Sequence, residues 1–128
     1  MQTTDKREVI ITNTPQQVYG FLKDPRNYLG GVDGVSVDSG GASFSVPSFG
    51  RIRADITNLI QDQKIVIYSK DINTSLTANL QEMGLDKTKV TLSVVSKPDC
   101  GLFKNLAIRL AIPKLLDAVV ESFKTTEI

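Results

Sequence analysis

The chain contains no histidine, and its 128 residues include a single cysteine, Cys100. Without histidine, this chain has no Ser-His-Asp or Cys-His catalytic arrangement, no histidine proton shuttle and no histidine metal ligand. One cysteine also excludes an internal disulfide and a multi-cysteine metal site. The phosphate-binding patterns Gly-x-x-x-x-Gly-Lys and Gly-x-Gly-x-x-Gly are absent as well. We therefore expect no metal and no cofactor.

Long apolar runs and a charge excess are also missing. No run of 18 apolar residues occurs, and the opening MQTTDKREV has no apolar h-region, so we expect neither a transmembrane helix nor a secretory signal. Together with the single cysteine, this favours a cytoplasmic protein. The 15 basic and 14 acidic residues leave a net charge of +1. Such a balance argues against a nucleic-acid partner.

What is present is a clear change of hydrophobic period along one domain-sized chain. Between residues 35 and 97 apolar residues recur mainly with period two, which is typical of strands. Thr14, Pro15 and Gln17 form a capping box, which predicts the start of a helix. We expect strands at Lys6–Thr12, Val35–Asp38, Ala42–Val46, Gly50–Ile60, Lys64–Ile72, Ser75–Glu82 and Thr88–Ser96, and helices at Pro15–Lys23, Arg26–Leu29 and Gly101–Lys124.

This order predicts an α+β fold. Consecutive strands joined by short turns are antiparallel neighbours, and strands with one polar face form a sheet that is dry on one side. The helices must cover the dry side. The run Gly101–Lys124 is the only predicted helix long enough to do so.

The stretch ITNTPQQVYGFLKDPRNYLGGVDGV, residues 11–35, carries a more specific signal. It places Val18-Tyr19, then Leu22-Lys23-Asp24-Pro25, on and just after a capped helix, and follows them with Asp33-Gly34-Val35. This pattern, with the whole element order, resembles the Bet v 1-like or START-related superfamily, also called SRPBCC. Within it, the chain looks closest to the CoxG-like branch, named for a component of carbon monoxide dehydrogenase, and to the polyketide cyclase/dehydrase-like branch.

The resemblance implies a helix-grip fold, in which a curved seven-stranded antiparallel sheet wraps around the C-terminal helix and encloses an apolar cavity. Three functions then remain open. The protein is a carrier of a small hydrophobic molecule such as a lipid, quinone or polyketide, a cofactor-independent cyclase or dehydrase, or a protein-interaction module. The third includes an accessory CoxG-like component of a larger enzyme or a relative of the co-chaperone branch. The oligomeric state is left open.

The alternation within each strand predicts which side chains reach such a cavity. Tyr68 offers a hydroxyl in the predicted strand whose faces are hardest to assign, and Asp71 and Glu82 are the candidates for a general acid or base. Tyr28 is expected to be a packing residue, and Ile60 to share the face of Ile56. The expected cavity residues are Phe44, Ile52, Ala54, Ile56, Tyr68, Leu76, Ala78, Leu80, Phe103, Leu106 and Leu110.

The long C-terminal run has two apolar stripes on different sides. Leu102, Phe103, Leu106, Ala107 and Leu110 form the first stripe. The second runs from Ile112 to Phe123, and Ile108 extends it backwards. Because proline kinks or breaks a helix, Pro113 predicts two half-helices with a hinge. We expect residues 102–112 to gate the cavity. Their second apolar side then meets a ligand, a membrane surface, a partner protein or the short helices that follow the first strand.

Overall fold

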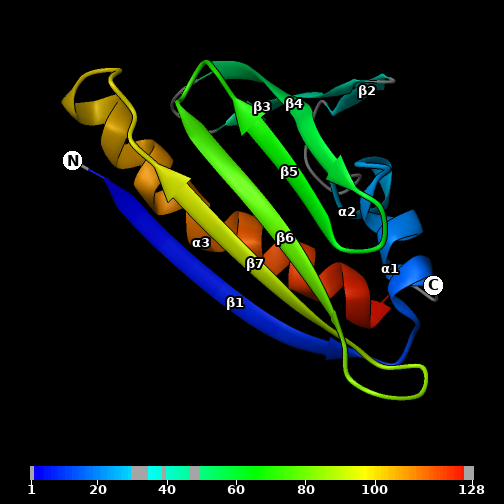
Figure 1. The fold of residues 1–128 in the computed structure, drawn as a ribbon. Coiled ribbons are helices and arrows are strands. Elements are labelled where there is room, and N and C mark those ends of the chain that lie inside the picture. Colours follow the sequence, from blue (N-terminus) through cyan, green and yellow to red (C-terminus); the bar gives the residue numbers. More distant parts are fainter. Residues whose placement is uncertain (1, 30–34, 39, 47–49, 126–128) are drawn as a thin grey trace.

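The computed structural model describes residues 2–29, 35–38, 40–46 and 50–125. Seven strands and three helices follow one another in the predicted order (Figure 1). The strands are β1 (Thr3–Ile11), β2 (Ser36–Asp38), β3 (Gly41–Val46), β4 (Gly50–Ile60), β5 (Lys64–Ser69), β6 (Thr74–Glu82) and β7 (Thr88–Ser96), and the helices are α1 (Pro15–Leu22), α2 (Arg26–Leu29) and α3 (Leu102–Thr125). The expected turn residues Gly30–Gly31 and Asp33–Gly34 fall outside the described residues.

All seven strands belong to one antiparallel sheet in the order β1-β7-β6-β5-β4-β3-β2. Only β1 is out of sequence order, because it pairs with β7 across its whole length from Thr3 with Ser96 to Ile11 with Thr88. Figure 1 shows the curved sheet with α3 crossing one face of it. The predicted α+β class and the helix-grip arrangement are confirmed.

Local sequence explains where the first helix begins. Thr14 Oγ1 accepts a hydrogen bond from the Gln17 backbone amide, and the Gln17 side chain accepts one from the Thr14 amide. These two bonds satisfy amides that a helix start leaves without partners. The buried face of α1 consists of Val18, Phe21 and Leu22, and it places α1 against the inner face of the sheet.

A bulge in β4 corrects one predicted side-chain direction. The pairing with β5 shifts between Ile56 and Asn58, so that Ile56 lies opposite Ile67 but Ile60 lies opposite Lys64. An extra residue in one strand moves the side chains of all later residues in that strand to the opposite face of the sheet. Ile60 is therefore 42% exposed and does not share the face of Ile56.

Helix α3 is continuous through Pro113, which corrects the predicted division into two half-helices. Ile108, Ile112 and Leu116 stand four residues apart and are at most 4% exposed, so one buried face spans the proline. Burial of that face offsets the free energy that the helix loses because proline removes one backbone hydrogen bond. Arg7 Nε also donates to Asp117 Oδ1 at 3.2 Å, which ties β1 to α3 beyond the proline.

Candidate functional site

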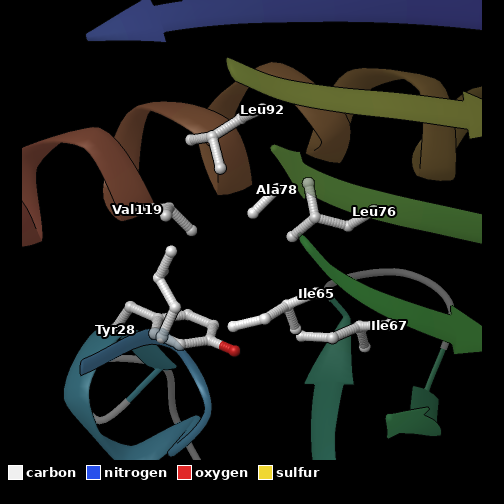
Figure 2. Close-up of a pocket in the computed structure, with 8 residues that line it drawn as sticks. Tyr28, Ile65, Ile67, Leu76, Ala78, Leu92 and Val119 are labelled. Atoms are coloured by element: carbon white, nitrogen blue, oxygen red, sulfur yellow. The ribbon is translucent and has the colours of Figure 1, made fainter. Parts of the chain in front are cut away.

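The inner face of the sheet and the helices enclose a small apolar cavity. Residues from β5, β6 and β7 form its floor, and α1, α2 and the C-terminal half of α3 close it from the other side. Figure 2 shows the side chains converging on this space from separate elements. The lining residues are Leu22, Tyr28, Ile65, Ile67, Leu76, Ala78, Leu92 and Val119.

The cavity measures about 10 Å³. That is about the space needed by one water molecule, whereas pockets that hold a small organic ligand enclose roughly 300–1,000 Å³. Seven of the eight lining side chains are aliphatic. The structure therefore shows a nearly closed interior with an apolar lining.

Tyr28 supplies the only polar side-chain atom among the eight lining residues. The residue is 6% exposed, and its ring packs against Phe21 with centroids 6.5 Å apart. Figure 2 shows the phenol oxygen on the side of Ile65 and Ile67. No described residue accepts a hydrogen bond from this hydroxyl. Burial, and secondarily the Asp24 carboxylate, raise the pKa of the Tyr28 phenol, so it stays a neutral donor.

Sequence reasoning assigned Tyr28 only a packing role. The signal that could have identified it is its position three residues after Pro25, which ends α1 together with Asp24. That stop turns α2 back under α1, with the Asn27 side chain donating to the Phe21 carbonyl at 2.8 Å. The same turn brings the ring of Tyr28 beneath the sheet.

Two of the expected cavity residues, Leu76 and Ala78, lie in the lining. Apart from Tyr68, the other expected residues on the sheet share its inner face but lie elsewhere along it. Phe44, Ile52 and Ala54 are buried in the core beneath β3 and β4, and Leu80 packs partly buried against that core. Ile56 is half-buried opposite Ile67.

The three candidate chemical groups do not meet in the cavity. Tyr68 lies on the outer face opposite Asp55 and Ser75, and its hydroxyl donates to Asn73 Oδ1 at 2.9 Å. The period-two pattern of β5 places Ile65 and Ile67 inward instead, which corrects the expectation for Tyr68.

The two carboxylates are also away from the interior. Asp71 is exposed in the turn after β5, where Oδ2 accepts a hydrogen bond from the Arg53 backbone amide at 2.8 Å. Glu82 is exposed at the end of β6. Neither residue lines the cavity, and none of its eight described lining residues carries a carboxylate or an amine.

The first stripe of α3 points away from the sheet, which corrects the expectation that Phe103, Leu106 and Leu110 line the cavity. Phe103 is 86% exposed, Leu110 62% and Leu106 48%. The buried face of the helix comprises Ile108, Ile112, Leu116, Val119 and Phe123. By helical geometry it leaves the first stripe on the opposite side.

A second, polar gap lies under the N-terminal half of α3. It measures about 30 Å³ and is lined by Thr3, Ser96, Pro98, Asn105 and Arg109. Nearby on the same face, Thr74 and Ser96 share a hydrogen bond of 2.7 Å. The first half of α3 therefore covers a polar gap beside buried Ile108 and Ile112, while the second half covers packed aliphatic side chains.

No helix among the described residues is both long and apolar enough to span a membrane. Within the same residues, no group of three or more acidic or cysteine side chains is placed to hold a metal ion. What the described part of the chain offers is therefore an apolar cavity with one phenol, and an exposed apolar strip on α3.

No protein-family model and no curated protein matches the chain. Solved structures do. The Mll3558 protein from Rhizobium loti aligns with a TM-score of 0.67 and 21% identity, over 95% of this chain and 97% of that one. A START superfamily protein from Mycobacterium smegmatis aligns with a TM-score of 0.68 and 8% identity, over 96% and 99%.

The Zhui aromatase/cyclase from Streptomyces sp. R1128 gives a TM-score of 0.68 at 9% identity, over 96% of this chain and 92% of that one. Such identities establish the shared fold, and function resides in sites built on folds rather than in the fold itself. The chain has the START-like helix-grip fold that the sequence resemblance implied.

Proposed function

We propose that the protein binds a small hydrophobic molecule between the inner face of the sheet and α3. The observation that carries the proposal is the cavity lining, in which seven aliphatic side chains surround the lone phenol of Tyr28. An apolar pocket with one well-placed polar group is the usual design of a ligand site. The phenol would orient a ligand that carries one hydrogen-bond acceptor.

The same lining favours binding over catalysis. None of the eight residues is charged, and general acid–base chemistry requires a titratable group within hydrogen-bond reach of the substrate. Tyr28 does not supply such a base, because the raised pKa of its phenol keeps it protonated. A ligand in this space meets an oriented donor and an apolar wall.

A ligand larger than a water molecule requires the sheet and α3 to separate, because the closed cavity holds about 10 Å³. The proposed moving part is the gate segment, residues 102–112, which adjoins the cavity along α3 without lining it. It is anchored mainly by Ile108 and Ile112, while Leu116, Val119 and Phe123 anchor the rest of the helix. Segments with fewer buried contacts open at lower free energy, and Pro113 lacks one helical hydrogen bond at the boundary.

Organic extraction of the purified protein, followed by mass spectrometry, tests this function. We expect a co-purifying apolar molecule that carries an acceptor oxygen. Native mass spectrometry before extraction should show the matching mass on the folded chain. A chain that is unliganded by native mass spectrometry and also fails to bind fluorescent fatty-acid and quinone probes would contradict the proposal.

A further inference from the structure

The N-terminal half of α3 presents large apolar side chains to solvent. Leu102 is 79% exposed and Phe103 86%, and with Leu106 and Leu110 they form what we call the exposed strip. At 1.5 Å per residue the strip extends for about 12 Å along the helix. Four large exposed apolar side chains on one stretch of helix make this strip a candidate docking surface.

Basic residues border this strip on both sides. At 100° per residue, Arg109 lies about 20° beyond Leu102 on one edge, and Lys114 about 20° beyond Phe103 on the other. Lys97 and Lys104 add two more positive charges, so that residues 97–116 contain four basic residues and one acidic residue, Asp99. Within α3, Lys104, Arg109 and Lys114 are all exposed.

The charge changes where the strip ends. In the second half of α3 the corresponding outward positions are taken by Asp117, Glu121 and Lys124, and Lys124 approaches Glu121 at 4.0 Å. An apolar outward face with only basic borders is thus confined to residues 102–114. Figure 1 shows this part of α3 at the end of the sheet away from α1 and α2.

We propose that the exposed strip docks the protein reversibly on the surface of an anionic lipid bilayer. A helix that lies in a membrane interface combines an apolar face with flanking Lys and Arg residues, and its apolar side chains enter the headgroup boundary by about 5–10 Å. Phe103 and the three leucines supply the apolar face. The basic border attracts anionic headgroups.

A second copy of the chain fits the strip less well. A two-fold contact through the strip would bring like charges together, because residues 100–116 contain no acidic side chain, and like charges across an interface are strongly unfavourable. A stable dimer also buries roughly 20–30 residues on each side. Four side chains on about two and a half turns of one helix do not provide such an area.

The test uses the absence of tryptophan from the chain. Phe103→Trp places a single fluorophore on the strip, and Leu85→Trp is the matched control, because Leu85 is 95% exposed in the loop between β6 and β7. We expect phosphatidylcholine vesicles that contain phosphatidylglycerol to shift the emission of the strip fluorophore to the blue. Brominated lipid should quench this emission, and the control should show neither effect.

Sedimentation with the same vesicles measures the strength of binding in otherwise unchanged protein. Phe103→Ser with Leu110→Ser should abolish co-sedimentation, whereas Leu85→Ser should leave it unchanged. Lys114→Gln should weaken it about fivefold, the effect of roughly one cation near an anionic surface, and added salt should weaken it further. Both strip residues are exposed, so circular dichroism should show a folded variant.

Three results would overturn the proposal. The first is equal binding to vesicles of phosphatidylcholine alone, which would remove the role of the basic border. The second is a blue shift of the strip fluorophore that grows with protein concentration in the absence of lipid, accompanied by a dimer in analytical ultracentrifugation. The third is no association with either kind of vesicle. Because these experiments require no ligand in the cavity, their outcome is separate from that of the ligand-binding proposal.

Discussion

Phe103 and Ile112 lie on opposite faces of α3, and the first is 86% exposed whereas the second is 4% exposed. Nine residues at 100° each place them about 180° apart. Both faces of the N-terminal half are therefore apolar, but only one of them packs on the protein. In the C-terminal half the outward face is charged, so the two halves of one helix carry different surfaces.

Replacing Leu116 and Leu110 separately by alanine tests this difference between the two faces. Leu116 is fully buried, and Leu116→Ala should lower the free energy of unfolding by about 2–5 kcal/mol through lost burial and a residual cavity. Leu110→Ala removes the same atoms from a 62% exposed position. This variant should change the free energy of unfolding by less than about 0.5 kcal/mol. Urea unfolding measures both. Equal losses would contradict the assignment of the faces.

Tyr28→Phe tests the neutral phenol. Because the folded protein raises the pKa of Tyr28, the stability that this group contributes is full below its ordinary pKa of about 10 and falls as the pH rises above it. We expect the variant to lose less stability than wild type in alkali. At neutral pH the two should differ by less than about 0.5 kcal/mol, since no hydrogen bond to a described residue is removed.

The corresponding spectroscopic readout is the near-ultraviolet absorbance of tyrosinate during an alkaline titration. The wild-type curve should contain a late step that coincides with unfolding and is missing in Tyr28→Phe. Identical curves for both proteins would contradict the burial of this phenol.

Asp38→Asn tests an ion pair on the outer face. The hydrogen bond from Arg53, 2.8 Å from Nη2 to Oδ1, and the Gly40 amide hold the pKa of Asp38 well below its usual range. The stability that the ionised Asp38 carboxylate contributes is therefore present above pH about 4 and is lost as the pH falls toward the lowered pKa. The stability difference between wild type and variant should be largest near neutrality and shrink in acid.

Glu82→Gln is the matched control for that titration, because Glu82 is an exposed carboxylate at the end of β6. At neutral pH its stability should equal that of wild type. If Asp38→Asn also followed wild type, the Arg53 pair would contribute nothing to the fold, as is common for exposed ion pairs.

Hydrogen exchange tests the gate segment. Amides of residues 102–112 should exchange faster than those of residues 115–123, since fewer buried side chains and a polar gap underlie them. An apolar ligand should slow the exchange of the first group. Equal protection in both groups, unchanged by ligand, would show that α3 is a rigid lid.

The order of elements and the antiparallel sheet were predictable from local signals. The capping box at Thr14, the Asp24-Pro25 stop and the period-two strands each act within a few residues, and the structure contains all of them. The inward direction of Leu76 and Ala78 followed from the same alternation. Short-range chemistry was sufficient for these features.

Other features depend on contacts between distant segments. The bulge at Thr57 that turns Ile60 outward is set by pairing with β5. Tyr28 reaches the cavity only because α2 folds beneath the sheet. Nor can periodicity decide which of two apolar stripes on α3 packs inward, because either stripe could serve. The buried row from Ile108 to Leu116 across Pro113 decides it.

The binding of cis-parinaric acid, a fluorescent fatty acid, tests most directly whether the cavity beneath α3 takes an apolar ligand. Ala78→Ile adds more volume than the closed cavity of about 10 Å³ holds, and Thr77→Ile adds a similar side chain on the outer face of the same strand. We predict saturable fluorescence enhancement in wild type, in Thr77→Ile and in Phe103→Ser, and its loss in folded Ala78→Ile. Undiminished binding by Ala78→Ile, or its loss in Phe103→Ser alone, would contradict a ligand site in the cavity.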